Sequence, residues 1–449
     1  MSANPDSKLS ASASAPGVHP KPFWSLRPAS DREAGDAVVS NFLLHWFPAK
    51  VTKASLAWNY SFWLGTISAA LLLLLIVSGV PLLFLYVPSV ERAYASVKDI
   101  EYVVTFGSWI RAVHRLSAHL MVAAVFLHMV RVFWTGAYKN GAGRGQRREW
   151  NWVLGMIMLL ATLFLSFTGY LLPWDQLAYW AITVGTNIAS SIPFVGPKLR
   201  ELLLGGRVIE QATLIRFYTL HVIFLPGALG VFFLYHMWRI RKDGGLARAD
   251  REARRSEAAE VAPSKTKTYT LLGVARGTSP VIRAATLEKP DTTVNSVPDL
   301  VRRAAIAVLG TIAAVSMLSV FVRSPLEEPA NPLVTPNPAK APWYFLWLQE
   351  IVTDTTIHVG SFTINGAFLG GVLLPGILVA LALAWPWLDR SPAAAAGVWF
   401  DRARRLQNRV FLALVVAILV LTVVGTFLRG PYWHFYWPWQ PWPELPGRI

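Results

Sequence analysis

The chain has 449 residues, of which 54% are hydrophobic and 15% charged, with a formal net charge of +16 and a mean hydropathy of +0.41. A soluble globular protein has about 25% charged residues, so this composition indicates a protein with several membrane-spanning helices. The basic residues lie in short segments between apolar runs, which argues against nucleic acid as a partner, and the absence of cysteine excludes disulfides, cysteine-bound zinc or iron–sulfur clusters and covalently attached c-type haem.

The first 50 residues precede the first apolar run. Residues 1–30 are rich in Ser, Ala and Pro and hold no apolar core of signal-peptide length. We therefore predict that residues 1–50 form an uncleaved cytoplasmic tail, disordered where it begins, followed by a surface helix.

Seven apolar stretches follow, each long enough to cross a bilayer, which takes about 20 residues of helix. They cover approximately residues 57–86, 107–134, 152–172, 214–239, 302–322, 366–388 and 408–428. Pro173 should end the third stretch, because proline interrupts helical hydrogen bonding. The predicted fold is an all-α polytopic membrane protein with about seven transmembrane helices.

Basic residues gather in the connections that follow the second, fourth and sixth spans. They are Lys139, Arg144, Arg147 and Arg148; Arg239, Arg241, Lys242, Arg248, Arg251, Arg254 and Arg255; and Arg390, Arg402, Arg404, Arg405 and Arg409. If the N-terminus is cytoplasmic, all three connections lie on the cytoplasmic side, where positive charge is favoured. The C-terminus and the other connections then lie outside.

A polar, basic stretch separates two helical halves. Residues 51–240 hold four spans, residues 241–300 form the predicted cytoplasmic linker, and residues 301–449 hold three spans. The connection 325–360 is rich in Pro and Trp, so we expect it to be ordered. The aromatic residues of 431–442 suit the outer membrane interface, where Trp and Tyr are enriched.

Four histidines lie within the spans, His114 and His128 on the second and His221 and His236 on the fourth. The spacings of 14 and 15 residues correspond to about 21–22 Å along a helix and to nearly whole numbers of turns. Because both spans run from outside to inside, His114 should lie level with His221, and His128 with His236. Each pair could hold one haem iron from both sides, which suits electron transfer and leaves no position for oxygen. The alternative is histidines hydrogen-bonded within the bundle, although polar groups inside membranes are usually functional.

Glycines repeat the histidine interval on the neighbouring spans. Gly65 and Gly79 lie on the first span, and Gly155 and Gly169 on the third, again 14 residues apart. Because glycine in a helix costs about 1 kcal/mol relative to alanine, the repeat indicates clearance for the edges of two flat macrocycles. Close helix packing through small residues is the alternative.

Two arginines lie one turn from the histidines on the same helix face. Arg111 precedes His114 by three residues, and Arg131 follows His128 by three. Either guanidinium could pair with a haem propionate. Anchoring at the membrane surface is the alternative, and it is stronger for Arg131, on the cytoplasmic side.

Together these residues carry a family resemblance. The histidine spacings and the segments 168–176 and 216–221 resemble the cytochrome b/b6 family, and the 15-residue step resembles its b6 branch. The segments 325–332 and 342–346 resemble subunit IV, the partner of cytochrome b6. The resemblance covers about residues 40–440, so the chain resembles a fusion of the two polypeptides.

The resemblance implies a cytochrome b subunit of a bc-type quinol:cytochrome c-type oxidoreductase. In that family quinol is oxidised at the outer face, near the haem that His114 and His221 would bind. One electron passes to a Rieske iron–sulfur protein, the other crosses to the haem of His128 and His236, a second quinone is reduced inside, and protons are translocated. The implied cofactors are two non-covalent b haems, with quinol as substrate. The implied partners are the Rieske protein, a c-type or multihaem cytochrome and membrane lipid, within a homodimeric complex of a bacterial inner membrane.

The sequence departs from the family at the outer quinol site. The family has Pro-Glu-Trp-Tyr there, whose Glu accepts a quinol proton, whereas residues 341–344 are Ala-Pro-Trp-Tyr. Glu350 is the nearest replacement, and we predict that it takes the proton; a structural role is the alternative. Trp343 and Tyr344 would line the site, and Tyr344 could hydrogen-bond a quinone oxygen or serve as an interface aromatic.

Two residues give expectations about cofactor and quinone binding on the inner side of the membrane. Trp63 stands where the b6 branch often has the cysteine that attaches an extra c-type haem, so no covalent third haem is expected. Arg241 matches a basic residue near the inner quinone site of relatives, with cytoplasmic anchoring as the alternative.

Two other functions are open to a chain of this kind. A haem-b membrane anchor would pass electrons between quinone and a dehydrogenase without a Rieske partner, but such anchors have four or five helices. A transporter or structural subunit would bind no redox centre and would show no haem absorbance.

Overall fold

The computed structural model describes residues 28, 30–40, 44, 47–140, 146–247, 293–360 and 362–443. Most of the predicted tail and the linker stretch 248–292 lie outside the described residues. So do Arg144, Arg248, Arg251, Arg254 and Arg255 of the predicted cytoplasmic connections.

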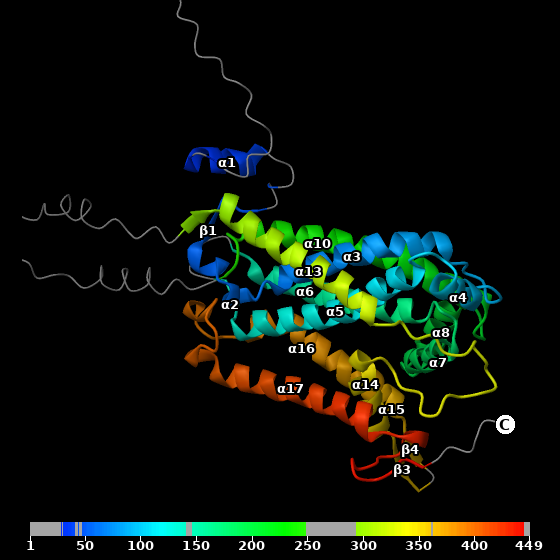
Figure 1. Cartoon of the computed structure of the whole chain (residues 1–449). Coiled ribbons are helices and arrows are strands. Elements are labelled where there is room, and N and C mark those ends of the chain that lie inside the picture. Colours follow the sequence, from blue (N-terminus) through cyan, green and yellow to red (C-terminus); the bar gives the residue numbers. More distant parts are fainter. Residues whose placement is uncertain are drawn as a thin grey trace, which may run out of the picture.

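Seven helices in the described part of the chain are long and apolar enough to cross a membrane, which confirms the predicted all-α polytopic fold (Figure 1). The first three are α3 (Leu64–Leu85), α5 (Gly107–Trp134) and α6 (Arg148–Tyr170). The fourth joins α9 (Gln211–Thr219), the π-helical turn η3 (Leu220–Phe224) and α10 (Leu225–Lys242). The fifth joins η4 (Ser296–Leu300) to α13 (Val301–Phe321), and the sixth joins α15 (Gly366–Phe368), η5 (Leu369–Leu373) and α16 (Leu374–Leu388). The seventh joins η7 (Arg402–Arg404), α17 (Arg405–Val423) and η8 (Val424–Leu428).

The first span starts later than the sequence pattern predicts. Residues Trp58–Ser61 form a separate short helix, α2, and the backbone of Phe62 and Trp63 then adopts positive φ values of 48° and 52°. This left-handed pair breaks the helix, so α3 begins only at Leu64. The third span ends at Tyr170, just before Pro173, as the proline predicts.

The first four spans pack together: α3 lies along α5, α6 lies along α10, and α5 contacts α6. The later spans pack against this bundle, α13 on α3 and α5, and α16 on α6. Leu71, Met121 and Val315 meet in the core between α3, α5 and α13.

One end of the bundle carries short helices and a hairpin, and we refer to it as the outer end, after the predicted orientation. These elements are α4 (Ala93–Tyr102), α7 (Gln176–Ser190), α8 (Gly196–Leu204), α14 (Trp343–Asp354), the strands β3 (Ile357–Val359) and β4 (Phe362–Ile364), and η9 (Pro431–Trp433). The turn before α7 is bonded to the segment after α13, since the Gln176 amide donates to the Glu328 carbonyl and the Ala330 amide to that of Trp174. The two segments that resemble cytochrome b6 and subunit IV therefore meet at this end.

The opposite, inner end holds α1 (Asp31–Ser40), β1 (Lys50–Thr52), η2 (Lys53–Leu56), β2 (Thr293–Asn295) and η6 (Ala393–Ala395). Strand β1 pairs antiparallel with β2, with Val51 opposite Val294. The Tyr60 hydroxyl donates to the carbonyls of Ala247 and Gly397. Both halves of the chain are thus fastened to the segment that precedes α3.

A buried polar cluster also joins the halves at the inner end. The Tyr138 hydroxyl donates to Asp389 Oδ2 at 2.6 Å, and Arg404 donates to the same oxygen at 3.2 Å and to the Tyr138 hydroxyl at 2.7 Å. Lys139 lies 3.5 Å from that carboxylate oxygen. The Arg404 and Asp389 side chains are fully buried, so this cluster is screened from water.

Candidate functional site

The four membrane histidines lie on the inward faces of α5 and the fourth span. The His114 and His221 ring centroids are 6.2 Å apart, with the ring planes at 75°. At the other level, His128 and His236 are close enough to interact electrostatically. The structure therefore brings together the two pairs at matched heights that the 14- and 15-residue spacings predict.

The His114–His221 separation fits a metal held between two imidazoles. An imidazole nitrogen binds a first-row metal at about 2.0 Å and lies about 1.1 Å from its ring centroid, so two such rings on opposite sides of one ion have centroids about 6.2 Å apart. The observed separation is 6.2 Å.

Hydrogen bonds fix which nitrogen of these two rings is free. Ser78 uses its hydroxyl hydrogen on the Leu74 carbonyl at 2.6 Å, so the 3.0 Å contact to His114 Nδ1 makes that nitrogen the donor. His221 Nδ1 lies 3.2 Å from the Leu165 carbonyl, which can only accept. The proton is on Nδ1 in both rings, and each Nε2 lone pair is available to a metal.

Each of the four predicted glycines lies against one of the four imidazoles. A Cβ added to Gly65 or Gly79 would lie 3.2 Å from Cε1 of His128 or His114 respectively. At Gly169 it would lie 2.5 Å from His221 Cε1, whereas at Gly155 the nearest atom, His236 Cε1, is 3.8 Å away. The glycines thus make room for the histidine rings, a role that the sequence pattern did not suggest, and clearance of a macrocycle remains a prediction.

The π-helical turn η3 explains the unequal histidine spacings. Helix α5 is α-helical from Gly107 to Trp134, and its histidines are 14 residues apart. The fourth span contains a π turn at Leu220–Phe224, a segment that includes His221. A π turn takes up about one extra residue, so a 15-residue step keeps both rings on the same face.

Arg131 fits an anionic group beside the inner pair. Its side chain is only 3% exposed, and its guanidinium lies 4.6 Å from the Tyr60 ring centroid. Its Nε and Nη2 have no hydrogen-bond partner among the described residues. A buried guanidinium in this state needs an acceptor, and burial argues against the alternative of anchoring at the surface.

Arg111, in contrast, already has partners. It bonds Glu101 at 2.6 Å and the carbonyls of Ser324 and Pro325 at 2.8 and 2.7 Å. These contacts join α5 to α4 and to the chain just after α13. Pairing with a propionate would require the guanidinium to exchange one of them.

The predicted outer-site residues divide between two faces of α14. Tyr344 is buried on the face near α5 and α6, and burial raises the pKa of its hydroxyl to about 12. Trp343 donates its indole N–H to His119 Nδ1 at 3.1 Å. Glu350 lies on another face, where its Oε1 accepts two bonds from Arg429, while its Oε2 is buried without a partner among the described residues. The structure thus brings Trp343 and Tyr344 to one site, whereas Glu350 is paired with Arg429.

Asp175 lies in the turn after α6 and bonds this turn to the segment after α13. Its carboxylate accepts from the Ala178 amide at 2.9 Å, capping α7, and from the Glu327 amide at 3.3 Å. Burial raises the pKa of Asp175, and the two amide bonds partly offset this shift. Sequence reasoning did not select this carboxylate, which is 7% exposed.

The two residues predicted for the inner side lie near the ends of spans. Trp63 is buried just before α3, and its indole N–H has no partner among the described residues. Arg241 is in the last turn of α10, half-buried.

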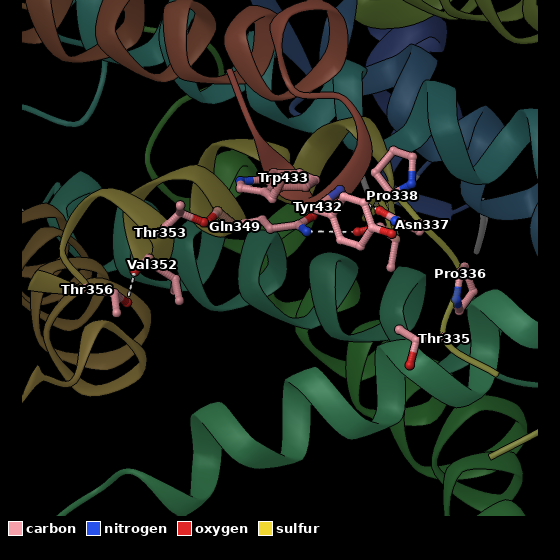
Figure 2. A pocket seen from close by; sticks show the side chains of 11 residues that line it. Thr335, Pro336, Asn337, Pro338, Gln349, Val352, Thr353, Thr356, Tyr432 and Trp433 are labelled. Atoms are coloured by element: carbon pink, nitrogen blue, oxygen red, sulfur yellow. Dashed lines mark hydrogen bonds between the residues drawn. The ribbon is translucent and has the colours of Figure 1, made fainter. Parts of the chain in front are cut away.

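A separate pocket of about 670 Å³ opens at the outer end between α14 and η9 (Figure 2). Asn337 and Tyr432 meet at its edge, where the Tyr432 amide donates to Asn337 Oδ1 at 2.5 Å. None of the residues lining it is charged, and none is a histidine.

These features define a class of protein, a multi-pass helical membrane protein with two pairs of histidines at two depths on neighbouring spans. Residues 50–244 match the family described as cytochrome b/b6/petB, and residues 329–437 match cytochrome b (C-terminal)/b6/petD. Cytochrome b6 of Synechococcus elongatus is 42% identical over 186 residues, 41% of this chain and 84% of that protein. Cytochrome b6 of Oltmannsiellopsis viridis is 45% identical over the same shares. A solved chain of a hyperthermophilic respiratory Complex III is similar with a TM-score of 0.63 and 25% identity, covering 85% of this chain and 86% of that one.

The chain belongs to the cytochrome b/b6 family. It carries both the N-terminal and the C-terminal parts of that family in one polypeptide, as the predicted fusion requires. It is a cytochrome b subunit of a bc-type complex, with an electron-transfer role, and the family binds haem b without covalent attachment.

Proposed function

We propose that the chain oxidises quinol at its outer end and carries electrons across the bilayer through two b haems. The observation that carries this proposal is the His114–His221 pair, with centroids 6.2 Å apart and both Nε2 atoms free. The two histidines would together hold one haem, which would supply one-electron transfer and leave no position for oxygen. His114 and His221 would hold the outer haem, and His128 and His236 the inner one.

The surrounding residues would orient the two haems. Ser78 and the Leu165 carbonyl hold the outer imidazoles in the tautomer that ligation needs. Arg131 would bind a propionate of the inner haem, and Arg111 one of the outer haem. The four glycines, Gly65, Gly79, Gly155 and Gly169, would let the rings and macrocycles approach the helices.

At the outer end, Tyr344 and Trp343 would bind quinol together with the turn that precedes α7. A pKa of about 12 keeps the Tyr344 hydroxyl protonated at neutral pH, so it can donate a hydrogen bond to a quinone oxygen. Glu350 would accept the quinol proton through Oε2, the carboxylate oxygen that Arg429 does not occupy. Arg241 would contribute to an inner site where a second quinone is reduced.

The proposed function requires a defined orientation of the chain in the membrane and redox partner subunits at its outer end. We place the N-terminus in the cytoplasm of a bacterium and the C-terminus outside its inner membrane. An electron passed from the outer to the inner haem would then move against an inside-negative membrane potential, at about 2.3 kcal/mol per 100 mV for a full crossing. The two electrons of quinol would go to different acceptors, one to a Rieske protein or another outer redox subunit that serves a c-type or multihaem cytochrome, and one to the outer haem. Protons would be released outside and taken up inside, within a homodimer. The halves 51–240 and 301–449 would act as the dihaem and quinol-site domains, joined by the 241–300 linker.

The first test is a reduced-minus-oxidised spectrum with pyridine haemochrome quantification. We expect two b haems per wild-type chain and the loss of one in each of His114→Leu and His128→Leu. His434→Leu, at an exposed position outside the spans, is the control and should keep both. A haem content that these ligand substitutions leave unchanged would refute the assignment.

A second test concerns the proton acceptor. Glu350→Gln keeps a hydrogen-bond acceptor for Arg429 but cannot take up a proton at this position. Loss of quinol oxidation with both haems retained would support the assigned role. Full quinol oxidation activity would eliminate Glu350 as the acceptor and leave it as a partner of Arg429 only.

A further inference from the structure

A cavity of about 300 Å³ lies between the middle of α5, the chain just after α13 and the start of α14. Its polar and aromatic lining comes from Arg115, His119, Arg323, Ser324 and Trp343. The rest of the lining is Ala112, Leu116, Val322 and Pro325. The cavity is close to Tyr344, whose ring centroid is 5.8 Å from that of His119.

The hydrogen bond from Trp343 fixes the tautomer of His119. An indole N–H can only donate, so His119 Nδ1, 3.1 Å from Trp343 Nε1, is the acceptor. The neutral ring then carries its hydrogen on Nε2. That N–H has no partner among the described residues, and the ring lines the cavity.

A second donor is available in the same cavity. Arg115 spends one N–H on a long bond of 3.4 Å to the Pro325 carbonyl, which leaves most of its donors for other acceptors. No carboxylate is among the lining residues. The cavity therefore presents hydrogen-bond donors from His119 and Arg115, with Arg323 and Ser324 also in its lining, beside an exposed indole face. This set complements a flat ring bearing carbonyl or hydroxyl oxygens.

We propose that this cavity binds a quinone head group, with the His119 Nε2–H donating to one of its oxygens. The inference rests on the proposed function and deepens it, because it adds a second quinone position beside Tyr344. Five residues turn an α-helix by about 140° beyond one full turn, so His119 points away from the face of α5 that carries His114. The cavity is thus a holding position on the way to the outer haem, and no electron transfer is assigned to it.

The test compares two substitutions of His119 in the purified complex. An Asn side chain ends near the position of Nδ1, so His119→Asn keeps an acceptor for Trp343 but removes the donor to the cavity. A Gln amide reaches the position of Nε2, so His119→Gln keeps the donor and loses the Trp343 contact. Lys198→Gln, in an exposed ion pair on α8, is the control.

The measurement is a calorimetric titration of the oxidised complex with decylubiquinone. We expect one binding site to weaken about tenfold in His119→Asn, the cost of one hydrogen bond, and clearly less in His119→Gln. Both variants should keep two haems by haemochrome analysis, which shows that they fold. The inference would be overturned if decylubiquinone binding weakened equally in the two variants or more in His119→Gln. If His119 served only to hold Trp343, His119→Gln would be the more damaging substitution, because it loses the Trp343 contact.

A second readout separates this inference from the proposed function. Decylubiquinol-driven reduction of the b haems should show a raised KM in His119→Asn, with kcat little changed, as expected for lost binding outside the reacting centre. If the wild-type complex binds decylubiquinone but decylubiquinol never reduces its haems, the proposed function fails and the binding inference stands. If quinol oxidation proceeds and neither Kd nor KM changes in His119→Asn, the inference alone fails.

Discussion

At the scale of single residues, the tightest contact of the haem region is between Gly169 and His221. A methyl group at Gly169 would lie 2.5 Å from the imidazole, closer than Cβ atoms approach other atoms in proteins. At Gly155 the same group would make an ordinary contact at 3.8 Å. The four glycines share a spacing, but they do not share the same need to be glycine.

This difference leads to a prediction about haem content. Gly169→Ala should displace the His221 ring and lose or strongly perturb the outer haem, because a ligated imidazole cannot move away. Gly155→Ala should keep both haems and gain slightly in helix stability, by up to about 1 kcal/mol. Pyridine haemochrome assays and redox titration of the two haems would measure this. Equal haem loss in both variants would contradict the role assigned to ring contact.

The sequence could reveal only those candidate site residues whose spacing along the chain reflects their arrangement in the fold. The four histidines were predictable because a bis-histidine site needs matched heights on two helices, and the sequence spacing encodes height directly. His119 has no counterpart at such a spacing, and its partner Trp343 lies 224 residues away, so only the folded chain brings them together. Likewise, the sequence cannot tell that Arg111 is occupied by Glu101 whereas Arg131 is buried without an acceptor.

At the scale of elements, the fourth span shows how a helix accommodates an extra residue. The π turn at Leu220–Phe224 lies directly at His221 and restores the facing of His236. Hydropathy predicted all seven spans because a bilayer sets the length of an apolar helix. It did not predict the start of α3, because the left-handed backbone at Phe62 and Trp63 depends on local packing and not on apolarity.

The π turn makes deletion of one residue testable. Deleting Ile223, which is 62% exposed, should convert the turn to α-helix and leave both haems bound, since the histidines would then be 14 residues apart as on α5. Deleting Leu127, which is 51% exposed and lies between His114 and His128, should lose a haem, because α5 has no π turn to absorb a rotation of about 100°. Haem quantification of both variants gives the answer. Loss of haem in the Ile223 deletion alone would refute the compensation.

At the scale of the whole molecule, the cluster of Tyr138, Asp389 and Arg404 holds the four-span half to the three-span half. Burial by itself would raise the pKa of Asp389, but hydrogen bonds from Tyr138 and Ser391 outweigh it and hold the pKa below its ordinary range. A carboxyl whose pKa is lowered by folding contributes stability above its unfolded pKa of about 3.9 and loses that contribution as the pH falls through its folded value. The join between the halves should therefore weaken in acid.

Removing the charge at this join should destabilise the protein. Asp389→Asn leaves Arg404 buried without its counter-charge, and we expect a loss of about 3 kcal/mol in the free energy of unfolding. Heating while following haem absorbance, from pH 7 down to about pH 3, would measure it. The variant should also respond less to acid than the wild type. Asp299→Asn, in the exposed pair with Arg302, is the control and should change little; a similar effect of both substitutions would mean that the buried cluster has no special role.

The arrangement of the inner end has a consequence for the history of the gene. Ala247, the last described residue before the linker stretch, is bonded to Tyr60, and Thr293, the first described residue after it, pairs with Thr52. The chain therefore leaves and re-enters the bundle at the same short segment, and the closure entropy of a loop changes only slowly with its length. A cut, an insertion or a new join between residues 247 and 293 would lie outside the contacts that the described residues make. Evolution could thus have encoded this architecture as one gene or as two adjacent genes without redesigning the protein that results.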